Sequence, residues 1–240
     1  MNRLVTWQQI PSPVVTEILC NSNLDGVVLD TEHGMWNPET VFNCIQVGLL
    51  KGKEVFVRFT ECNETLVRGC LDASATGAIF AKVDSMEYAQ RIKKICNFPS
   101  QGGRRGLGLV RENGWGRLSL IGARPILVIQ IESEAGVKLC HKFTSLDFDY
   151  YMIGSYDLSI DLGVTGQFEH ERFRRAVQYV VDEVGIENMG CHLVKNEQVR
   201  LEGDKIGKFG FVALSIDTIM LTEGLEWLDN LLSLDDSLDG

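Results

Sequence analysis

Apolar residues occur in short runs along this chain, and stretches with helical spacing separate the runs. Many of the runs are apolar without interruption and rich in β-branched residues, as is typical of parallel strands buried on both faces. The runs cover residues 4–7, 26–30, 54–59, 78–83, 125–131, 150–153, 189–194 and 209–214. About eight strand–helix units result, which predicts an α/β fold of the (β/α)₈ TIM-barrel type.

The segments between the runs begin with helix-start signals. A side chain able to cap a helix precedes five of them, and proline follows two of these caps directly. The capping residues are Ser12, Asn37, Asn63, Ser85 and Asn196. The last segment, residues 223–234, has regularly spaced leucines and should close the ring or pack on a neighbouring subunit. A doubly wound open sheet competes with the barrel, but the first strand-to-helix turn lacks its glycine fingerprint.

Composition adds limits to this picture. With 240 residues, of which 45% are hydrophobic, residues 1–240 can form a single barrel domain. The net charge is −10 and no basic block occurs, so nucleic acid and membrane surfaces are not expected partners. The seven cysteines show no C-x-x-C spacing and suggest reduced thiols. The N-terminal segment has no apolar run of signal-peptide length, and we expect a cytoplasmic protein.

Polar side chains follow the apolar runs where the strands should end. In TIM barrels the catalytic groups come from the carboxyl ends of the strands, which meet at one rim. We therefore expect these side chains to converge on one site. The candidates are Asp30, His33, Arg58, Gln130, Glu132, Tyr156 and Asp157.

Two of the candidates are suited to hold a metal. Glu132 and Asp157 are single carboxylates at neighbouring strand ends, and such oxygen ligands suit Mg²⁺ or Mn²⁺. Either residue alone would more often cap the following helix. Their joint position at one rim favours a metal site. Gln130 should share the strand face of Glu132, where its amide needs a partner such as a substrate oxygen.

Arg58 and His33 suggest the remaining roles. Arg58 can bind a carboxylate with two parallel hydrogen bonds, although an internal salt bridge to a rim acid is nearly as plausible on pattern alone. His33 is one of four histidines and a candidate general base, with Asp30 as the group that orients it. Glu32, between them, is expected to face away or to pair elsewhere.

A long glycine-rich stretch covers residues 101–117. Loops of this length inside compact domains are often functional lids or interface arms. It lacks the G-x-x-x-x-G-K-[ST] spacing of a phosphate-binding loop, so a phosphate site is only weakly indicated.

The ordered segments "VVLDTEHG", "GGRRGLGLVR", "ILVIQIES", "IGSYDLSIDLG" and "FVALSIDT" resemble one known family over nearly the whole chain. This is the HpcH/HpaI family of class II, metal-dependent pyruvate aldolases. It includes 2,4-dihydroxyhept-2-ene-1,7-dioate aldolase and 2-dehydro-3-deoxyglucarate aldolase. Two positions depart from the family pattern, Lys82 and Ser155, where the family commonly has proline. These changes concern the aldehyde pocket and leave the substrate identity open.

The resemblance implies a phosphoenolpyruvate/pyruvate-type barrel and assigns roles residue by residue. Glu132 and Asp157 would bind the divalent metal, which is Mg²⁺, Mn²⁺ or Co²⁺ in this interpretation. Arg58 would hold the carboxylate of the pyruvate moiety, assisted by Gln130 and by the segment at Tyr156 and Asp157. His33 would be the acid/base group with Asp30 orienting it. Family members form dimers, trimers or hexamers in which neighbours exchange the last helices.

The implied activity is reversible cleavage of a 4-hydroxy-2-oxo acid into pyruvate and an aldehyde through a metal-stabilised enolate. Three alternatives stay open from the sequence. A Schiff-base aldolase would use Lys82 or Lys195. A thioester lyase related to citrate lyase β subunits would need a coenzyme A site, for which no basic cluster is present. A non-catalytic barrel would keep the metal site without turnover.

Overall fold

The computed structural model describes residues 2–119, 124–195 and 206–235, with side chains up to residue 232. Eight parallel strands form a closed barrel in chain order, and β8 pairs with β1 to complete it. The strands are β1 (Arg3–Gln8), β2 (Gly26–Asp30), β3 (Glu54–Phe59), β4 (Gly77–Phe80), β5 (Ile126–Ile131), β6 (Tyr150–Ile153), β7 (Met189–Leu193) and β8 (Phe211–Ile216). The predicted (β/α)₈ barrel is confirmed, and the open sheet is excluded.

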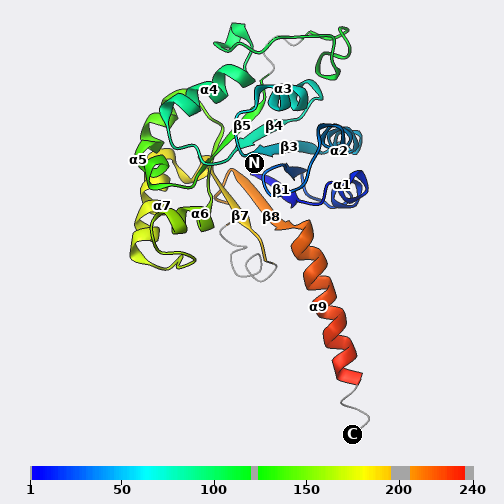
Figure 1. Cartoon of the computed structure of the whole chain (residues 1–240), viewed down its shortest axis with the longest axis vertical. Helices are drawn as coiled ribbons and strands as arrows, with labels where there is room; N and C mark the ends of the chain where they lie inside the picture. Colours follow the sequence, from blue (N-terminus) through cyan, green and yellow to red (C-terminus); the bar gives the residue numbers. More distant parts are fainter. Residues whose placement is uncertain (1, 120–123, 196–205, 236–240) are drawn as a thin grey trace.

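Helices surround the barrel on its outer side (Figure 1). The α-helices are α1 (Pro13–Cys20), α2 (Pro38–Leu50), α3 (Glu64–Asp72), α4 (Met86–Cys96), α5 (Glu134–Phe143), α6 (Ser155–Asp161), α7 (Glu171–Val184) and α9 (Asp217–Asp235). Short 3₁₀ turns are η1 (Pro99–Gln101), η2 (Arg111–Asn113), η3 (Thr144–Leu146) and η4 (Ile186–Asn188). The side chains of three predicted caps accept backbone N–H groups of the following helices, as expected for Asn37, Asn63 and Ser85. Ser12 makes no such bond, and Asn196 lies outside the described residues.

Strands β4 and β8 differ most from their predicted limits, and both have left-handed backbone near their carboxyl ends. Strand β4 ends at Phe80, and Lys82 beyond it has a left-handed φ of 46°. Strand β8 continues to Ile216, past the predicted end at residue 214. Its pairing with β1 shifts register, and Ser215 has a φ of 57°. An extra residue in one strand is a β-bulge, which periodicity alone does not reveal.

The barrel interior is packed with apolar side chains from its strands. They include Val5, Val28, Phe56, Ile79, Val128, Met152 and Phe211. A second, larger cluster lies between the strands and the surrounding helices. A filled interior gives the polar side chains at the rim a rigid floor, as in other TIM barrels.

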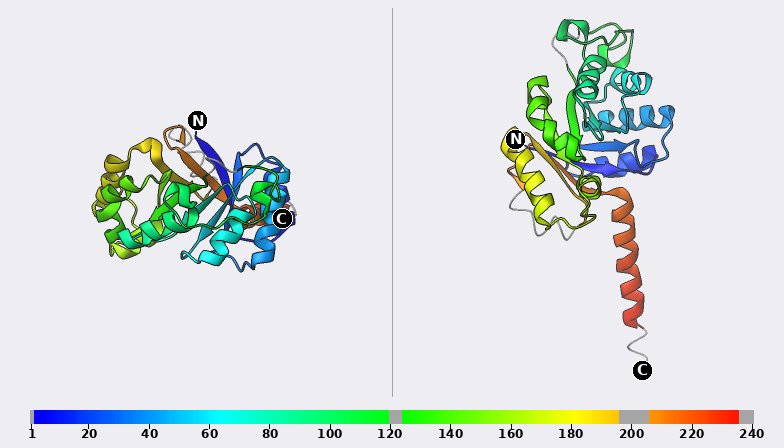
Figure 2. Two further views of the ribbon diagram at one scale, coloured as in Figure 1. Left: turned by 90° about the horizontal axis from the view of Figure 1, so that it is seen from above. Right: turned by 60° about the vertical axis from the view of Figure 1, so that its left-hand side comes forward.

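Helix α9 leaves the barrel and extends away from it (Figures 1 and 2). Because β8 and β1 pair directly, the first of the two alternatives for the last segment, closure of the ring, is excluded, and packing on a neighbouring subunit stays a prediction. The helix exposes large apolar side chains, which among the described residues are Met220, Leu221, Leu225, Trp227, Leu228, Leu231 and Leu232. None of the described helices is long and apolar enough to cross a membrane.

The glycine-rich stretch lies in the connection between α4 and β5, at the opposite end of the molecule from α9 (Figure 1). Buried Arg105 pairs there with Asp72 at the end of α3 and with Glu112. Arg104 pairs with Glu64 at 2.5 Å. The pairs with Asp72 and Glu64 attach the stretch to α3. Its exposed large apolar side chains are Leu107, Leu109 and Trp115.

Candidate active site

The ends of β2 and β3 are joined by a buried ion pair. The Nε and Nη2 groups of Arg58 donate to the two carboxylate oxygens of Asp30 at 2.9 and 2.7 Å. The Asp30 side chain is fully buried and that of Arg58 is 10% exposed. Burial opposes ionisation of Asp30, but the hydrogen bonds and charge of Arg58 outweigh it, so the pKa of Asp30 is lowered. The internal salt bridge considered for Arg58 is therefore present.

Glu32 also faces this arginine. Its Oε2 lies 2.7 Å from Nη1 of Arg58 and 4.0 Å from Nε2 of His33. Burial raises the pKa of Glu32, and the charge of Arg58 offsets this only in part. We expected Glu32 either to face away or to pair with another residue, and it pairs with Arg58. Its place inside the polar cluster was not predicted from the sequence.

The expected side-chain contact between Asp30 and His33 does not form. The Asp30 carboxylate accepts the backbone N–H groups of Glu32 and His33 at 3.2 and 3.3 Å, and both of its oxygens bind Arg58. The His33 side chain is 58% exposed and its nearest acid is Glu32. As a correction, Asp30 holds the guanidinium of Arg58 rather than the imidazole of His33.

Glu132 follows β5 and is buried at the rim. Its Oε2 accepts the backbone N–H of Lys82 at 2.9 Å. A Cβ atom on Gly154 would lie 2.2 Å from its Oε1, so a residue with a side chain at 154 would displace this carboxylate. Burial and the nearby charges of Glu32 and Asp157 raise the pKa of Glu132 to about 7.

Asp157 lies in the first turn of α6, directly after β6, and is exposed. Within the described residues, no arginine, lysine or histidine lies within ion-pair distance of Asp157 or Glu132. The described residues also contain no group of three or more histidine, cysteine or acidic side chains able to hold a metal ion. Two carboxylates fit a hard cation that takes its other oxygens from water and substrate. This donor set therefore suits Mg²⁺ or Mn²⁺ in an open site, and it is not a closed site in which the protein supplies every ligand.

Gln130 and Tyr156 occupy different environments. The Gln130 amide is buried, its Nε2 contacts only Met152 Sδ at 3.8 Å, and its Oε1 has no hydrogen-bond partner. A buried amide with a free end is suited to a substrate oxygen, since the two ends of the amide can exchange places. Tyr156 is 68% exposed and packs edge-on against Phe168. Its ring lies outside the polar cluster.

Two aromatic side chains that the sequence analysis did not assign to the site support Arg58. The guanidinium lies 5.2 Å from the centre of the Trp7 ring, and Trp7 stacks on His192 at 4.7 Å. Burial lowers the pKa of His192 to about 4, and its Nε2 contacts the Ser215 carbonyl oxygen at 3.1 Å. A neutral imidazole can stack beneath the Trp7–Arg58 pair without repelling the cation.

The two lysines of the Schiff-base alternative lie in solvent. Lys82 and Lys195 are both exposed. A lysine that forms an imine at neutral pH needs a desolvated or electropositive surrounding that lowers its pKa. The exposure of both side chains therefore does not favour this alternative.

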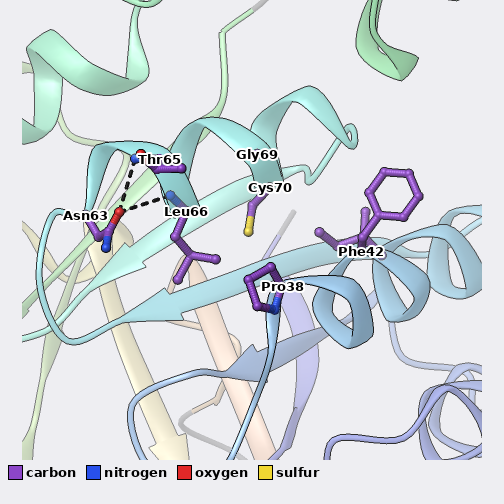
Figure 3. A pocket seen from close by; sticks show the side chains of 8 residues that line it. Pro38, Phe42, Asn63, Thr65, Leu66, Gly69 and Cys70 are labelled. Carbon is purple, nitrogen blue, oxygen red and sulfur yellow. Dashed lines mark hydrogen bonds between the residues drawn. The ribbon is translucent and has the colours of Figure 1, made fainter.

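Two surface hollows lie apart from the rim. One of about 350 Å³ is formed by α2 and α3, and Pro38, Phe42, Leu66 and Cys70 contribute to its wall (Figure 3). The other, of about 340 Å³, lies between α5 and α7. Neither includes a residue of the polar cluster. The convergent charges, rather than these apolar hollows, identify the candidate active site.

Comparison with known proteins gives consistent relatives. A 4-hydroxy-4-methyl-2-oxoglutarate aldolase of Hapsidospora irregularis is 29% identical over 195 residues, covering 74% of this chain and 67% of its own. A hydroxypyruvate/pyruvate aldolase of Roseobacter denitrificans is 25% identical over 224 residues, or 90% of this chain and 86% of its own. The crystal structure of an HpcH/HpaI aldolase/citrate lyase family protein of Burkholderia cenocepacia superposes with a TM-score of 0.86 at 21% identity, covering 97% and 95% of the two chains.

The family model of the same name matches residues 3–212, which include every strand of the barrel except the end of β8. The matched range also contains the whole polar cluster at the rim. The chain belongs to the HpcH/HpaI aldolase/citrate lyase family.

Proposed function

We propose that this protein is a divalent-metal-dependent aldolase that reversibly cleaves a 4-hydroxy-2-oxo acid into pyruvate and an aldehyde. The observation that carries the proposal is the pair Glu132 and Asp157, two rim carboxylates without an ion-pair partner among the described residues. Arg58 lies close enough to influence Glu132 electrostatically. The aldolase names of two relatives agree with this chemistry.

Glu132 and Asp157 would hold the cation in this proposal. Glu132 is fixed from two sides, by the N–H of Lys82 and by the close approach of Gly154, whereas Asp157 is free to adjust. A divalent cation bound there supplies Lewis-acid stabilisation of the negative charge that develops on the 2-oxo acid as the C3–C4 bond breaks. Carboxylates and a hard cation are matched in charge and size.

Arg58 orients the substrate. Its guanidinium is held in place by Asp30 on one edge and by Trp7 on one face. A side chain fixed in this way loses little further entropy when it binds the carboxylate of the 2-oxo acid. Gln130 donates through Nε2 to a substrate oxygen when its amide turns over, so that Nε2 takes the place of the unpartnered Oε1.

His33 handles the proton. It takes the proton of the 4-hydroxyl group as the bond between C3 and C4 breaks, and returns it in the direction of synthesis. Its exposure is compatible with this role, because an aldehyde must enter and leave on the solvent side. Glu32 is the acid nearest to its imidazole.

The test is pyruvate release from a panel of 4-hydroxy-2-oxo acids, with EDTA and with added Mg²⁺, Mn²⁺ or Co²⁺. We expect turnover with metal and its loss with EDTA. Cleavage that persists in EDTA would contradict the proposal, and a pyruvyl adduct on Lys82 or Lys195 after borohydride would move the protein to the Schiff-base class. An acyl-coenzyme A substrate in the same panel tests the thioester lyase alternative.

We further propose a cytoplasmic homo-oligomer, a dimer, trimer or hexamer. The exposed leucines and Trp227 of α9 form an apolar surface on a helix that extends from the barrel (Figure 2). Such a surface favours packing against another copy of the chain. All seven cysteines are free thiols, which agrees with a reducing compartment. Light scattering that gives a monomer at micromolar concentration would contradict the assembly.

A further inference from the structure

The hydrogen-bond donors of Arg58 leave one route for an incoming carboxylate. A guanidinium group has two edges that can each bind a carboxylate in parallel. In Arg58 the edge formed by Nε and Nη2 is taken by Asp30, which is fully buried. The remaining edge is formed by Nη1 and Nη2. Glu32 lies beside this edge as an ion-pair partner, with Oε2 at 2.7 Å from Nη1.

We propose that Glu32 occupies the place of the substrate carboxylate on Arg58, and that the bound 2-oxo acid displaces it toward His33. Glu32 is a positioning residue in this scheme, and it couples binding of the acid to preparation of the base. The inference rests on the aldolase function proposed above. It adds a residue that neither the sequence patterns nor the assigned roles included.

The carboxylate of Glu32 needs to move only a short distance to pass from Arg58 to His33. Its Oε2 lies 4.0 Å from Nε2 of His33, beyond hydrogen-bond distance, so the two groups interact only electrostatically while Glu32 is bound to Arg58. A shift of roughly 1 Å would bring them to the usual distance of a charge-assisted bond. The side chain of Glu32 is 16% exposed, so it retains some space at the solvent side of the cluster.

Local charge supplies the driving force for the displacement. Asp30 and Glu32 carry one negative charge more than Arg58 balances, Asp157 interacts unfavourably with Glu32, and Glu32 interacts unfavourably with Glu132. A substrate carboxylate on the same edge of Arg58 would place two negative groups side by side, and the more loosely held one leaves. The Asp30 carboxylate is held by two bonds from Arg58 and by two backbone N–H groups. Glu32 is therefore the group that moves.

The exchange predicts opposite effects on binding and turnover. Removing the charge of Glu32 frees the outer edge of Arg58, so pyruvate should bind more tightly. The same change removes the acid that would hold the protonated His33, so cleavage should slow. A residue with a merely structural role would weaken both.

The experiment is calorimetric titration of pyruvate at saturating Mg²⁺, paired with kcat and KM for cleavage. The variants are Glu32→Gln, which removes the charge and keeps the size of the side chain, and Glu32→Ala, which removes the carboxyl group altogether. The matched control is Glu39→Gln, an exposed acid in the first turn of α2. We expect pyruvate to bind roughly two- to tenfold more tightly to both Glu32 variants, as befits loss of a partly exposed ion pair. We expect kcat to fall by about tenfold or more, and the control to match the wild type.

Two contrary results have different meanings. If the wild-type protein binds pyruvate but neither Glu32 variant binds it more tightly, the exchange is refuted and the aldolase function stands. If the wild-type protein neither binds pyruvate nor releases it from any substrate, the proposed function itself is refuted. Thermal unfolding followed by circular dichroism identifies a variant that fails to fold, and the other variant then decides.

Discussion

The two halves of the barrel rim carry similar acids in opposite electrostatic situations. At the ends of β2 and β3, Asp30 and Glu32 both pair with Arg58. At the ends of β5 and β6, Glu132 and Asp157 have no ion-pair partner among the described residues, and the pKa of Glu132 is raised to about 7 by burial and by neighbouring acids. In the paired half, both acids already have a positively charged partner. The unpaired half gains stability only when a cation or a proton arrives.

This difference separates the tasks of the two halves. An arginine fixed by a buried acid suits recognition of a substrate carboxylate, because its geometry is set before the ligand binds. A pair of carboxylates without a positively charged partner suits a divalent cation, because the cation removes the repulsion between them that burial has strengthened. Each half can therefore be disturbed on its own, and the expected effects differ in kind.

The largest effect is expected in the unpaired half. Glu132→Gln or Asp157→Asn removes one of two charged ligands and should abolish metal-stimulated turnover while the fold is kept. Assays of kcat with added Mn²⁺ measure the loss. Glu134→Gln is the control, since Glu134 lies two residues after Glu132 but pairs with Lys138 on the surface. Turnover of Glu132→Gln near that of the control would mean that this half holds no catalytic metal.

Replacement of His33 should have the second largest effect. His33→Ala removes the proposed proton carrier and should lower kcat by about 10²–10⁴ with little change in pyruvate affinity. Asp30→Asn should behave differently, raising KM through Arg58, because Asp30 contacts the guanidinium rather than the imidazole. Steady-state kinetics on one substrate separate the two patterns. A fall in kcat alone for Asp30→Asn would restore Asp30 as the partner of His33.

Removal of Arg58 should destabilise the paired half. Arg58→Ala leaves Asp30 buried without its counter-charge, which costs about 3–5 kcal/mol in other proteins. Arg124→Ala is a matched control, because Arg124 also binds an aspartate, Asp149, through two bonds but is 38% exposed. The control should lose about 1 kcal/mol or less. Urea unfolding compares the two variants, and equal losses would show that burial of the Arg58 pair has no energetic consequence.

The smallest expected effect is a pH dependence in the metal-free protein. The pKa of Glu132 rises from its ordinary 4.5 to about 7 in the folded state. The folded state then binds the proton more tightly than the unfolded state, so this stability is present below pH 4.5 and is lost as pH rises through about 7. The shift corresponds to about 3 kcal/mol. The melting temperature of metal-free Glu132→Gln should therefore rise relative to that of the wild type between pH 5 and pH 8. A difference that stays constant over this range would contradict the prediction.

The strands of the barrel could be predicted because burial on both faces leaves a direct pattern in the sequence. The runs 26–30, 54–59 and 150–153 coincide with β2, β3 and β6. The left-handed backbone at Lys82 and the bulge at Ser215 could not be predicted, because non-glycine residues rarely adopt that conformation. The orientation of α9 could not be predicted either, because regularly spaced leucines do not indicate which surface packs against them.

The place of four polar residues along the strands could be predicted from the sequence, but their pairing could not. Asp30 and Arg58 lie at the carboxyl ends of β2 and β3, and His33 and Glu132 follow β2 and β5. Which acid binds Arg58 depends on side-chain reach in three dimensions. One signal was available: the alternation that put Gln130 and Glu132 on one strand face also puts Asp30 and Glu32 on one face. Applied to β2, it would have drawn Glu32 into the cluster.

The central claim is that the unpaired acids of β5 and β6 bind a divalent cation and that the paired half does not. Titration of the metal-free protein with Mn²⁺, followed by electron paramagnetic resonance, tests it without any need for a substrate. We predict about one Mn²⁺ bound per chain through two carboxylates, with loss of this binding in Glu132→Gln and in Asp157→Asn and its retention in Glu134→Gln. Equal Mn²⁺ binding by the wild type and by Glu132→Gln, or none by the wild type, would contradict the account.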